Sequence, residues 1–268
     1  MPEEFEEIKS RHNALLKEIR TALRGGELSA RGLLPIEGPL LLREAFKSRI
    51  AVDSLLVRDS TLLDAGLQNW LRDGRARVFT VSADLMTSIA DTETPSGILG
   101  LVRLPQWKLE ALLPEKAALF LVLVQLQDPG NLGTIIRCAE AFGVTAVLAT
   151  PETVSPFNPK AVRASAGSIF RVPIFRGFRE TDLFEVFKAH RIVTVATSLR
   201  AQQSIETLRL HPPLALYIGQ EAAGLPENTL AACQSRVRIP MRESVQSLNV
   251  AIATGILLYE IRRHEKTH

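Results

Sequence analysis

Two polar side chains, Asn131 and Arg137, stand where a predicted buried strand leads into a helix, and both have the chemistry to bind a polyanion. The apolar run 119–126 predicts the strand, and Asp-Pro-Gly-Asn at 128–131 is typical of a turn. Beyond Gly133 the apolar residues recur at helical spacing, which predicts a helix. Free backbone N–H groups at the start of such a helix bind nucleotide-like ligands. The sequence therefore predicts a ligand site with an amide and a guanidinium.

Two segments near the C-terminus carry further polar residues in a similar context. Residues 214–225 predict a second buried strand and a loop that contains Gly219 and Glu221. Residues 237–241, Val-Arg-Ile-Pro-Met, precede Ser-Leu-Asn-Val at 247–250 and a long apolar helix. A loop glutamate is usually solvated, and a serine before a helix is usually an N-cap. Neither segment therefore specifies a site by itself.

Taken in order, the three blocks resemble motifs one, two and three of the SpoU family of RNA ribose 2′-O-methyltransferases, the TrmH-like branch of the SPOUT superfamily. Residues 158–168 also resemble the connecting segment of that family, so that the resemblance covers residues 117–262. The second block departs from the family pattern, because Gly-Gln-Glu-Ala at 219–222 replaces the usual Gly-Asn-Glu-Gly. We interpret Gln220 and Ala222 as tolerated variation, although a positive φ at Ala222 would cost about 1 kcal/mol.

The resemblance implies methyl transfer from S-adenosylmethionine to a ribose 2′-hydroxyl of RNA, with ribosomal RNA favoured over transfer RNA. Such a reaction needs alignment of the hydroxyl with the methyl group and loss of a proton, so no metal ligands are expected. The resemblance implies five catalytic residues, which are Asn131, Arg137, Glu221, Ser247 and Asn249. It implies seven cofactor-binding residues, which are Thr197, Leu199, Gly219, Gly224, Ile239, Ser247 and Leu248.

Each of these roles has a structural alternative. The arginine of the family is often proposed as a general base, but a guanidinium stays protonated, so we interpret Arg137 as a clamp on the target phosphate. Asn131 either contacts the ribose or Arg137, or serves only the turn. Glu221 either orients one of these two side chains or is solvated. Ser247 either caps the last helix or contacts the cofactor. The apolar members of the cofactor set are also candidates for the core.

Residues 1–104 are expected to form a separate small α/β domain, because helices and strands alternate along them. Short motifs at 10–13, 36–38 and 94–98 resemble the substrate-binding domain that precedes the catalytic part of many SpoU enzymes, which is similar to a small ribosomal-protein fold that binds kinked RNA. The expected helices lie at 5–23, from 37 to 46, at 62–73 and at 83–89, and the expected strands at 50–58, 77–81 and 97–103.

Positive charge is concentrated in this N-terminal segment. Residues 9–49 contain nine Lys or Arg and four Glu, whereas the net charge of the whole chain is only +3. Charge on one helix is often only a solvated face, but these residues are spread over forty positions. We therefore expect an RNA-facing patch here.

Residues 105–116 have the prolines and charges of a linker, and residues 117–268 form the predicted methyltransferase domain. Strands are expected near Leu119, Ala146, Ile192 and Leu214 in a mostly parallel sheet. The resemblance implies a deep trefoil knot in this domain, which is a rare chain topology. It also implies a homodimer through this domain, in agreement with a last helix that is apolar on more than one side.

Composition narrows the class of protein. The chain has 268 residues, 46% of them hydrophobic, and no run of about 18 uncharged apolar residues, so no membrane span is expected. The acidic start at 3–7 does not resemble a signal peptide, and a cytoplasmic protein is expected. Cys138 and Cys233 lack the spacing of a zinc site or a disulfide framework, and both are expected to be buried thiols.

Two other functions fit parts of the sequence. A dinucleotide-binding enzyme would need Gly-x-Gly-x-x-Gly and an acidic residue after the next strand, but the turn has only Gly130 and Gly133, and the next strand ends at 149–151 without one. A non-catalytic RNA-binding or ribosome-assembly factor that keeps the fold is the stronger alternative. The presence of all five candidate catalytic residues argues against it.

Overall fold

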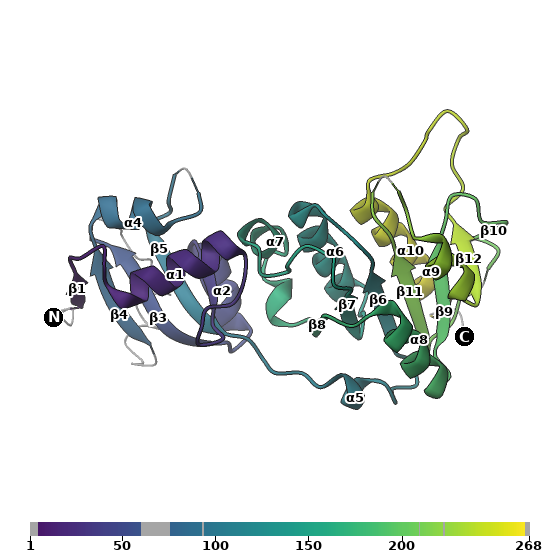
Figure 1. Ribbon diagram of the computed structural model, residues 1–268, viewed down its shortest axis with the longest axis horizontal. Helices are drawn as coiled ribbons and strands as arrows, with labels where there is room; N and C mark the ends of the chain where they lie inside the picture. The colour runs from purple at the N-terminus through teal and green to yellow at the C-terminus, as the bar shows by residue number, and fades with distance from the viewer. Residues whose placement is uncertain (1–4, 60–75, 93, 209, 222, 266–268) are drawn as a thin grey trace. The chain divides into compact units, whose positions relative to one another are not determined.

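The structure is a computed structural model that describes residues 5–59, 76–92, 94–208, 210–221 and 223–265. The chain forms two compact units, each with its own sheet (Figure 1). One unit contains Met1–Gln106 and Ser155–Phe170, and the other contains Trp107–Val154 and Arg171–His268. The helix expected at 62–73 falls outside the described residues. Within those residues, no helix is long and apolar enough to cross a bilayer.

The first unit is built on a mixed five-stranded sheet. Its strands are β1 (Glu6–Ile8), β2 (Leu34–Glu37), β3 (Ala51–Arg58), β4 (Arg77–Val81) and β5 (Ile98–Arg103). Its described helices are α1 (Ala14–Gly25), α2 (Pro39–Lys47), α4 (Ala83–Ile89) and α7 (Pro159–Ala164), with the short 3₁₀ turn η1 (Ser168–Phe170). The strand order is β1-β4-β3-β5-β2, with β5 antiparallel to both of its neighbours. Apolar residues of α1 and α4 pack on β3, β4 and β5 to form the core.

Two parts of this unit differ from the sequence-based expectation. The single helix expected at 5–23 is wrong, because β1 precedes α1 and pairs with β4. The helix begins only after Asn13, whose Oδ1 accepts a hydrogen bond from the backbone N of Leu15 at 2.9 Å and so acts as the N-cap. Strand β2 was not expected, since Pro35 interrupts it. It lies at the edge of the sheet, where a proline without an N–H group is tolerated.

The second unit contains a seven-stranded sheet, in which all described pairings are parallel, as the sequence predicted for most of it. Its strands are β6 (Leu119–Leu123), β7 (Ala146–Ala149), β8 (Ile174–Arg176), β9 (Val193–Thr197), β10 (Gln203–Ser204), β11 (Leu214–Ile218) and β12 (Ser235–Arg238). Its helices are α5 (Leu109–Leu112), α6 (Pro129–Ala141), α8 (Glu180–Ala189), α9 (Glu227–Ala232) and α10 (Val250–Glu265). Helix α5 lies inside the segment that was predicted as a linker.

The strand order β10-β12-β9-β11-β6-β7-β8 places β11 and β6 side by side near the middle of the sheet. Every residue of these two strands is buried, which explains why both are continuous apolar runs in the sequence. Because the strands are parallel, their carboxyl ends lie at the same end of the sheet. The turn that starts α6 and the loop that follows β11 therefore emerge close together.

Helices α6 and α10 pack side by side in the same direction. At the middle of the pair, a Cβ on Gly255 of α10 would lie 3.5 Å from Cys138 Sγ of α6. At the far end, the rings of Phe142 and Tyr259 meet edge to face with centroids 6.2 Å apart, and Arg262 Nε donates to the carbonyl oxygen of Phe142 at 2.6 Å. The N-termini of both helices consequently lie at the same end, where the loops after β6 and β11 emerge.

Segment 155–170 packs on the first unit, and this packing yields a stability prediction. Gly167 has a φ of +92°, and a Cβ there would lie 2.6 Å from Glu44 Cβ, whereas Gly32 has a φ of +70° and no atom within 4 Å of an added Cβ. We expect Gly167→Ala to lower the free energy of unfolding by clearly more than Gly32→Ala, which carries only the backbone strain of about 1 kcal/mol. Urea denaturation of both variants measures the difference. Equal losses of unfolding free energy in the two variants would contradict the close contact between Gly167 and Glu44.

Candidate active site

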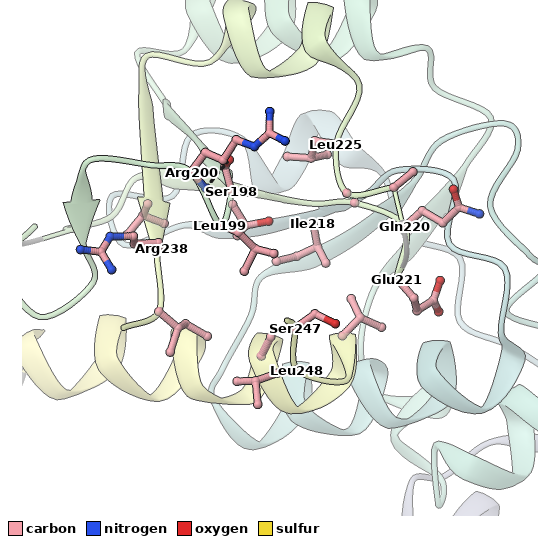
Figure 2. A pocket seen from close by; sticks show the side chains of 18 of the residues that line it. Ser198, Leu199, Arg200, Ile218, Gln220, Glu221, Leu225, Arg238, Ser247 and Leu248 are labelled. Carbon is pink, nitrogen blue, oxygen red and sulfur yellow. Dashed lines mark hydrogen bonds between the residues drawn. The ribbon is translucent and has the colours of Figure 1, made fainter. Parts of the chain in front are cut away.

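A pocket of about 810 Å³ opens in the second unit between β9, β11 and β12 and the segment that precedes α10 (Figure 2). Its volume is in the range of small-molecule sites. All seven residues that the sequence suggested for cofactor binding line this pocket: Thr197, Leu199, Gly219, Gly224, Ile239, Ser247 and Leu248. Glu221, from the catalytic set, lines it as well. The structure thus brings together segments that are about 20 to 50 positions apart in the chain.

The loop after β11 forms one wall of the pocket, and its geometry requires a glycine. Gln220 and Gly224 exchange two backbone hydrogen bonds of 3.1 and 2.9 Å, which close the loop tightly. A Cβ on Gly219 would lie only 2.3 Å from the carbonyl carbon of Gly224. Only a glycine therefore fits at position 219. The strain suggested for Ala222 concerns a residue outside the described part of the chain.

Three candidate catalytic residues, Glu221, Asn131 and Asn249, are joined by consecutive side-chain hydrogen bonds, and we call this set the relay. Asn131 Nδ2 donates to Glu221 Oε1 at 3.0 Å, and Asn249 Nδ2 donates to Asn131 Oδ1 at 2.9 Å. Asn249 Oδ1 accepts from the backbone N of Ala251 at 2.9 Å, which makes it the cap of α10. The backbone N of Asn131 donates to Asp128 Oδ1 at 2.8 Å, so that Asp128 caps α6. The relay joins the starts of two helices to the loop after β11.

The direction of each bond in this relay is fixed by chemistry. An ionised glutamate only accepts hydrogen bonds, so Asn131 must present its NH₂ group to Glu221. A backbone N–H only donates, so the oxygen of Asn249 must face the start of α10 and its NH₂ group must face Asn131. Of the partners considered for Glu221, the structure selects Asn131.

Arg137 is not part of this relay. It lies six residues after Asn131 on α6, about 9 Å further along the helix, and its side chain is exposed. Within the described residues, it makes no hydrogen bond and no ion pair. Its guanidinium is therefore available to a ligand that approaches from solvent.

Ser247 had two possible roles, and the structure separates them. The side chain that caps α10 is that of Asn249, so the first of the two alternatives for Ser247 is not what the structure shows. Ser247 is exposed and lines the pocket next to Leu248 (Figure 2). Ile239 and Leu248 are both half-buried and also line the pocket, so neither is a fully buried core residue.

Sequence reasoning missed three charged residues of the pocket lining, Arg200, Glu227 and Arg238. Arg200 follows β9, Glu227 is in the first turn of α9, and Arg238 ends β12. A charged side chain at the end of a strand or within three residues of it was the signal for the first and the last of these. Among the described residues, no group of three or more His, Cys, Asp or Glu side chains is arranged to hold a metal ion.

The core beneath the pocket contains polar groups that stay uncharged. Burial, and secondarily the charge of Glu180, raises the pKa of the Cys233 thiol to about 12. Burial also raises the pKa of Tyr217, whose ring stacks on Phe184 with centroids 5.0 Å apart. Cys138 is only half-buried, so the expectation of two buried thiols is correct for Cys233 alone. A buried thiol with a raised pKa is a poor nucleophile, which leaves Cys233 a structural role.

The polarity of the relay predicts that Asn131→Asp destabilises the protein at neutral pH. The new carboxylate would face Glu221 and repel it, which raises the pKa of the pair in the folded state. Stability lost at pH 7 should therefore return as the pH falls and one carboxyl group is protonated. Asn158→Asp is the matched control, because Asn158 also lies at a helix start, and there its Oδ1 caps α7 by accepting from the backbone N of Lys160, a role that Asp fills equally well. The midpoint of thermal unfolding, measured between pH 4 and 8, should rise toward low pH for Asn131→Asp relative to Asn158→Asp. The same pH dependence in both variants would refute the assigned direction of the hydrogen bonds.

Comparison with known proteins gives this geometry a family context. The model of the SpoU rRNA Methylase family matches residues 118–259, and the model of an MRM3-like substrate binding domain matches residues 16–100. The 23S rRNA (guanosine(2553)-2′-O)-methyltransferase RlmP of Bacillus subtilis is 31% identical over 258 residues, which cover 96% of this chain and 100% of RlmP.

Solved structures resemble the chain over nearly its whole length. An AdoMet-bound rRNA methyltransferase from Sinorhizobium meliloti is 30% identical with a TM-score of 0.83, over 97% of this chain and 98% of the other. The SpoU methyltransferase AviRb from Streptomyces viridochromogenes, in complex with the cofactor AdoMet, is 27% identical with a TM-score of 0.85, over 95% of this chain and 99% of the other. The resemblance drawn from three sequence blocks is confirmed, and the chain belongs to the SpoU rRNA methylase family.

Proposed function

We propose that this chain methylates a ribose 2′-hydroxyl in ribosomal RNA, with S-adenosylmethionine as the methyl donor. The activity class and the cofactor follow from membership of the family and from its AdoMet-bound relatives. The choice of ribosomal RNA rests on relatives that are named as 23S rRNA methyltransferases. The observation that carries the proposal for this chain is the relay of Asn131, Glu221 and Asn249 beside a pocket lined by all seven candidate cofactor residues.

The pocket fits the cofactor in size and in chemistry. Leu199, Ile239 and Leu248 offer apolar surface to a purine, and the loop at Gly219 lines the same pocket. We assign to the hydroxyl of Ser247, which lines the pocket, a contact with the cofactor. S-adenosylmethionine supplies a methyl group on a sulfonium, which is a good leaving group.

The protein side of the reaction is then mainly alignment. We assign to the relay the task of holding the amide of Asn131 and the carboxylate of Glu221 in fixed positions for the ribose. Arg137, exposed and without an ion pair in the described structure, is assigned to the target phosphate, since a guanidinium binds phosphate through two parallel hydrogen bonds. Correct alignment alone lowers a barrier by several kcal/mol.

The first unit is proposed to bind the RNA, with residues 1–104 as the substrate-binding domain, 105–116 as the linker and 117–268 as the methyltransferase domain. The match to a substrate binding domain supports this division. Part of the expected basic patch is neutralised, because Arg31 forms ion pairs with Glu18 and Asp53, each at 3.0 Å. RNA contacts are therefore assigned to the basic residues of segment 9–49 whose side chains have neither an ion pair nor a hydrogen bond in the described structure, which are Arg11, Lys17, Arg24 and Arg49.

A homodimer through the second unit is part of the proposal. Ile252, Ile256 and Tyr259 of α10 are 57%, 36% and 53% exposed, and their spacing places them on one face of the helix. Three large apolar side chains on one exposed face are typical of an interaction surface, and a two-fold contact is the commonest way to cover it. The trefoil knot and the cytoplasmic location, where ribosomes are modified, belong to the same proposal.

Methyl transfer by Arg137 variants tests the function. Wild-type protein should transfer labelled methyl groups from S-adenosylmethionine to ribosomal RNA in the presence of a chelator. Arg137→Ala is expected to lose most activity and keep its cofactor affinity, because the side chain is assigned to RNA. Arg137→Lys should fail as well, since a point charge does not reproduce a planar clamp. Near-normal turnover of the Lys variant would overturn the clamp, and an inactive wild type that binds RNA would favour the non-catalytic alternative.

Sedimentation tests the dimer. At low micromolar concentration, the protein should sediment at twice its chain mass of 29.5 kDa. Ile252→Asp is expected to produce monomers, because it places a charge within the apolar face of α10. Leu40→Asp is the matched control, since Leu40 is 61% exposed but lies in the first unit. A fully active wild-type monomer would contradict the proposed dimer.

A further inference from the structure

The cofactor pocket contains charged side chains that the alignment of ribose and phosphate does not use. Of the four charged residues in its lining, Glu221 is engaged by Asn131. The side chains of Arg200, Glu227 and Arg238 make no hydrogen bond or ion pair with any described residue. Two cations and one anion thus stand at the pocket with their charges uncompensated by the described protein.

The two arginine side chains of this set point in different directions. Figure 2 shows the side chain of Arg200 directed toward Leu225, whereas that of Arg238 is directed away from the pocket. Glu227 follows Leu225 by two residues and opens α9. The backbone N of Arg200 donates to Ser198 Oγ at 3.2 Å, which holds the turn after β9. Arg200 and Glu227 are therefore both connected with the lining around Leu225, the first by its direction and the second by its place in the chain, and no salt bridge joins them.

A cation and an anion that line one pocket without pairing match a ligand with both charges. The methionyl end of S-adenosylmethionine carries a carboxylate and an ammonium group on the same carbon atom. We propose that Arg200 and Glu227 form the subsite for this amino-acid end, in which Arg200 binds the carboxylate and Glu227 binds the ammonium group. The inference rests on the proposed use of S-adenosylmethionine.

This subsite gives the pocket a means to select the complete cofactor. The apolar wall and the Gly219 loop contact groups that every adenosine derivative shares. Arg200 and Glu227 would distinguish a ligand with an amino-acid end from one without it. Because both residues are exposed, water screens their charges, and each contact is expected to contribute a few-fold in affinity.

Calorimetric titration with three ligands tests the subsite. S-adenosylmethionine carries both charges of the amino-acid end, its decarboxylated form carries only the ammonium group, and 5′-methylthioadenosine carries neither. Arg200→Ala should weaken binding of S-adenosylmethionine by about two- to fivefold and leave the other two affinities unchanged. Glu227→Gln should weaken both ammonium ligands and leave 5′-methylthioadenosine unchanged. Arg238→Ala is the matched control and should leave the ratios of the three affinities unaltered.

Each outcome decides the inference. Equal weakening of all three ligands by Arg200→Ala would mean that the residue only supports the fold of the pocket. Unchanged S-adenosylmethionine affinity, with loss of RNA affinity and a smaller salt dependence, would assign Arg200 to a phosphate instead. Both results overturn the subsite while the wild type still binds the cofactor. A wild type that binds none of the ligands would instead remove the proposed function itself.

Discussion

The amide of Asn131 is the interaction on which the rest of the active site depends. An amide presents a donor at one end and an acceptor at the other, so it can join the carboxylate of Glu221 to the NH₂ group of Asn249. A carboxylate at this position would lack the donor, and an aliphatic side chain would lack both groups. Since Asn249 also caps α10, the same set of bonds fixes a helix, a loop and the edge of the pocket.

The sheet makes this meeting possible. The relay joins positions 131, 221 and 249, which are brought together because β6 and β11 are neighbouring parallel strands and α10 lies along α6. At the far end of the helices, Arg262 Nε donates a hydrogen bond to the carbonyl oxygen of Phe142. Such contacts also fix the position of one helix N-terminus relative to the other. The packing of α6 on α10 is thus coupled to the position of the Asn131 amide.

The sequence predicts best what depends on local pattern. Continuous apolar runs identified the central strands β6 and β11, and the order of three blocks identified the residues of the pocket. Partners cannot be predicted in the same way, because the relay depends on which helix start meets which loop. The sequence alone therefore does not decide between two partners for Glu221, or between a cap and a cofactor contact for Ser247. Strand β1 was assigned to a helix, because Ile8 fits the helical spacing as well as it fits the pairing with β4.

The two helices that hold the relay also carry the features that face outward. Arg137 lies on the exposed side of α6, and Ile252 and Tyr259 lie on the exposed side of α10. A phosphate bound by Arg137 would restrain α6. A second copy packed on α10 would restrain the helix that Asn249 caps. The first event would act on Asn131 through its own helix, and the second would act on it through Asn249. Binding of RNA and assembly of the proposed dimer would thereby reinforce the alignment that the reaction requires, without any contact to the cofactor itself.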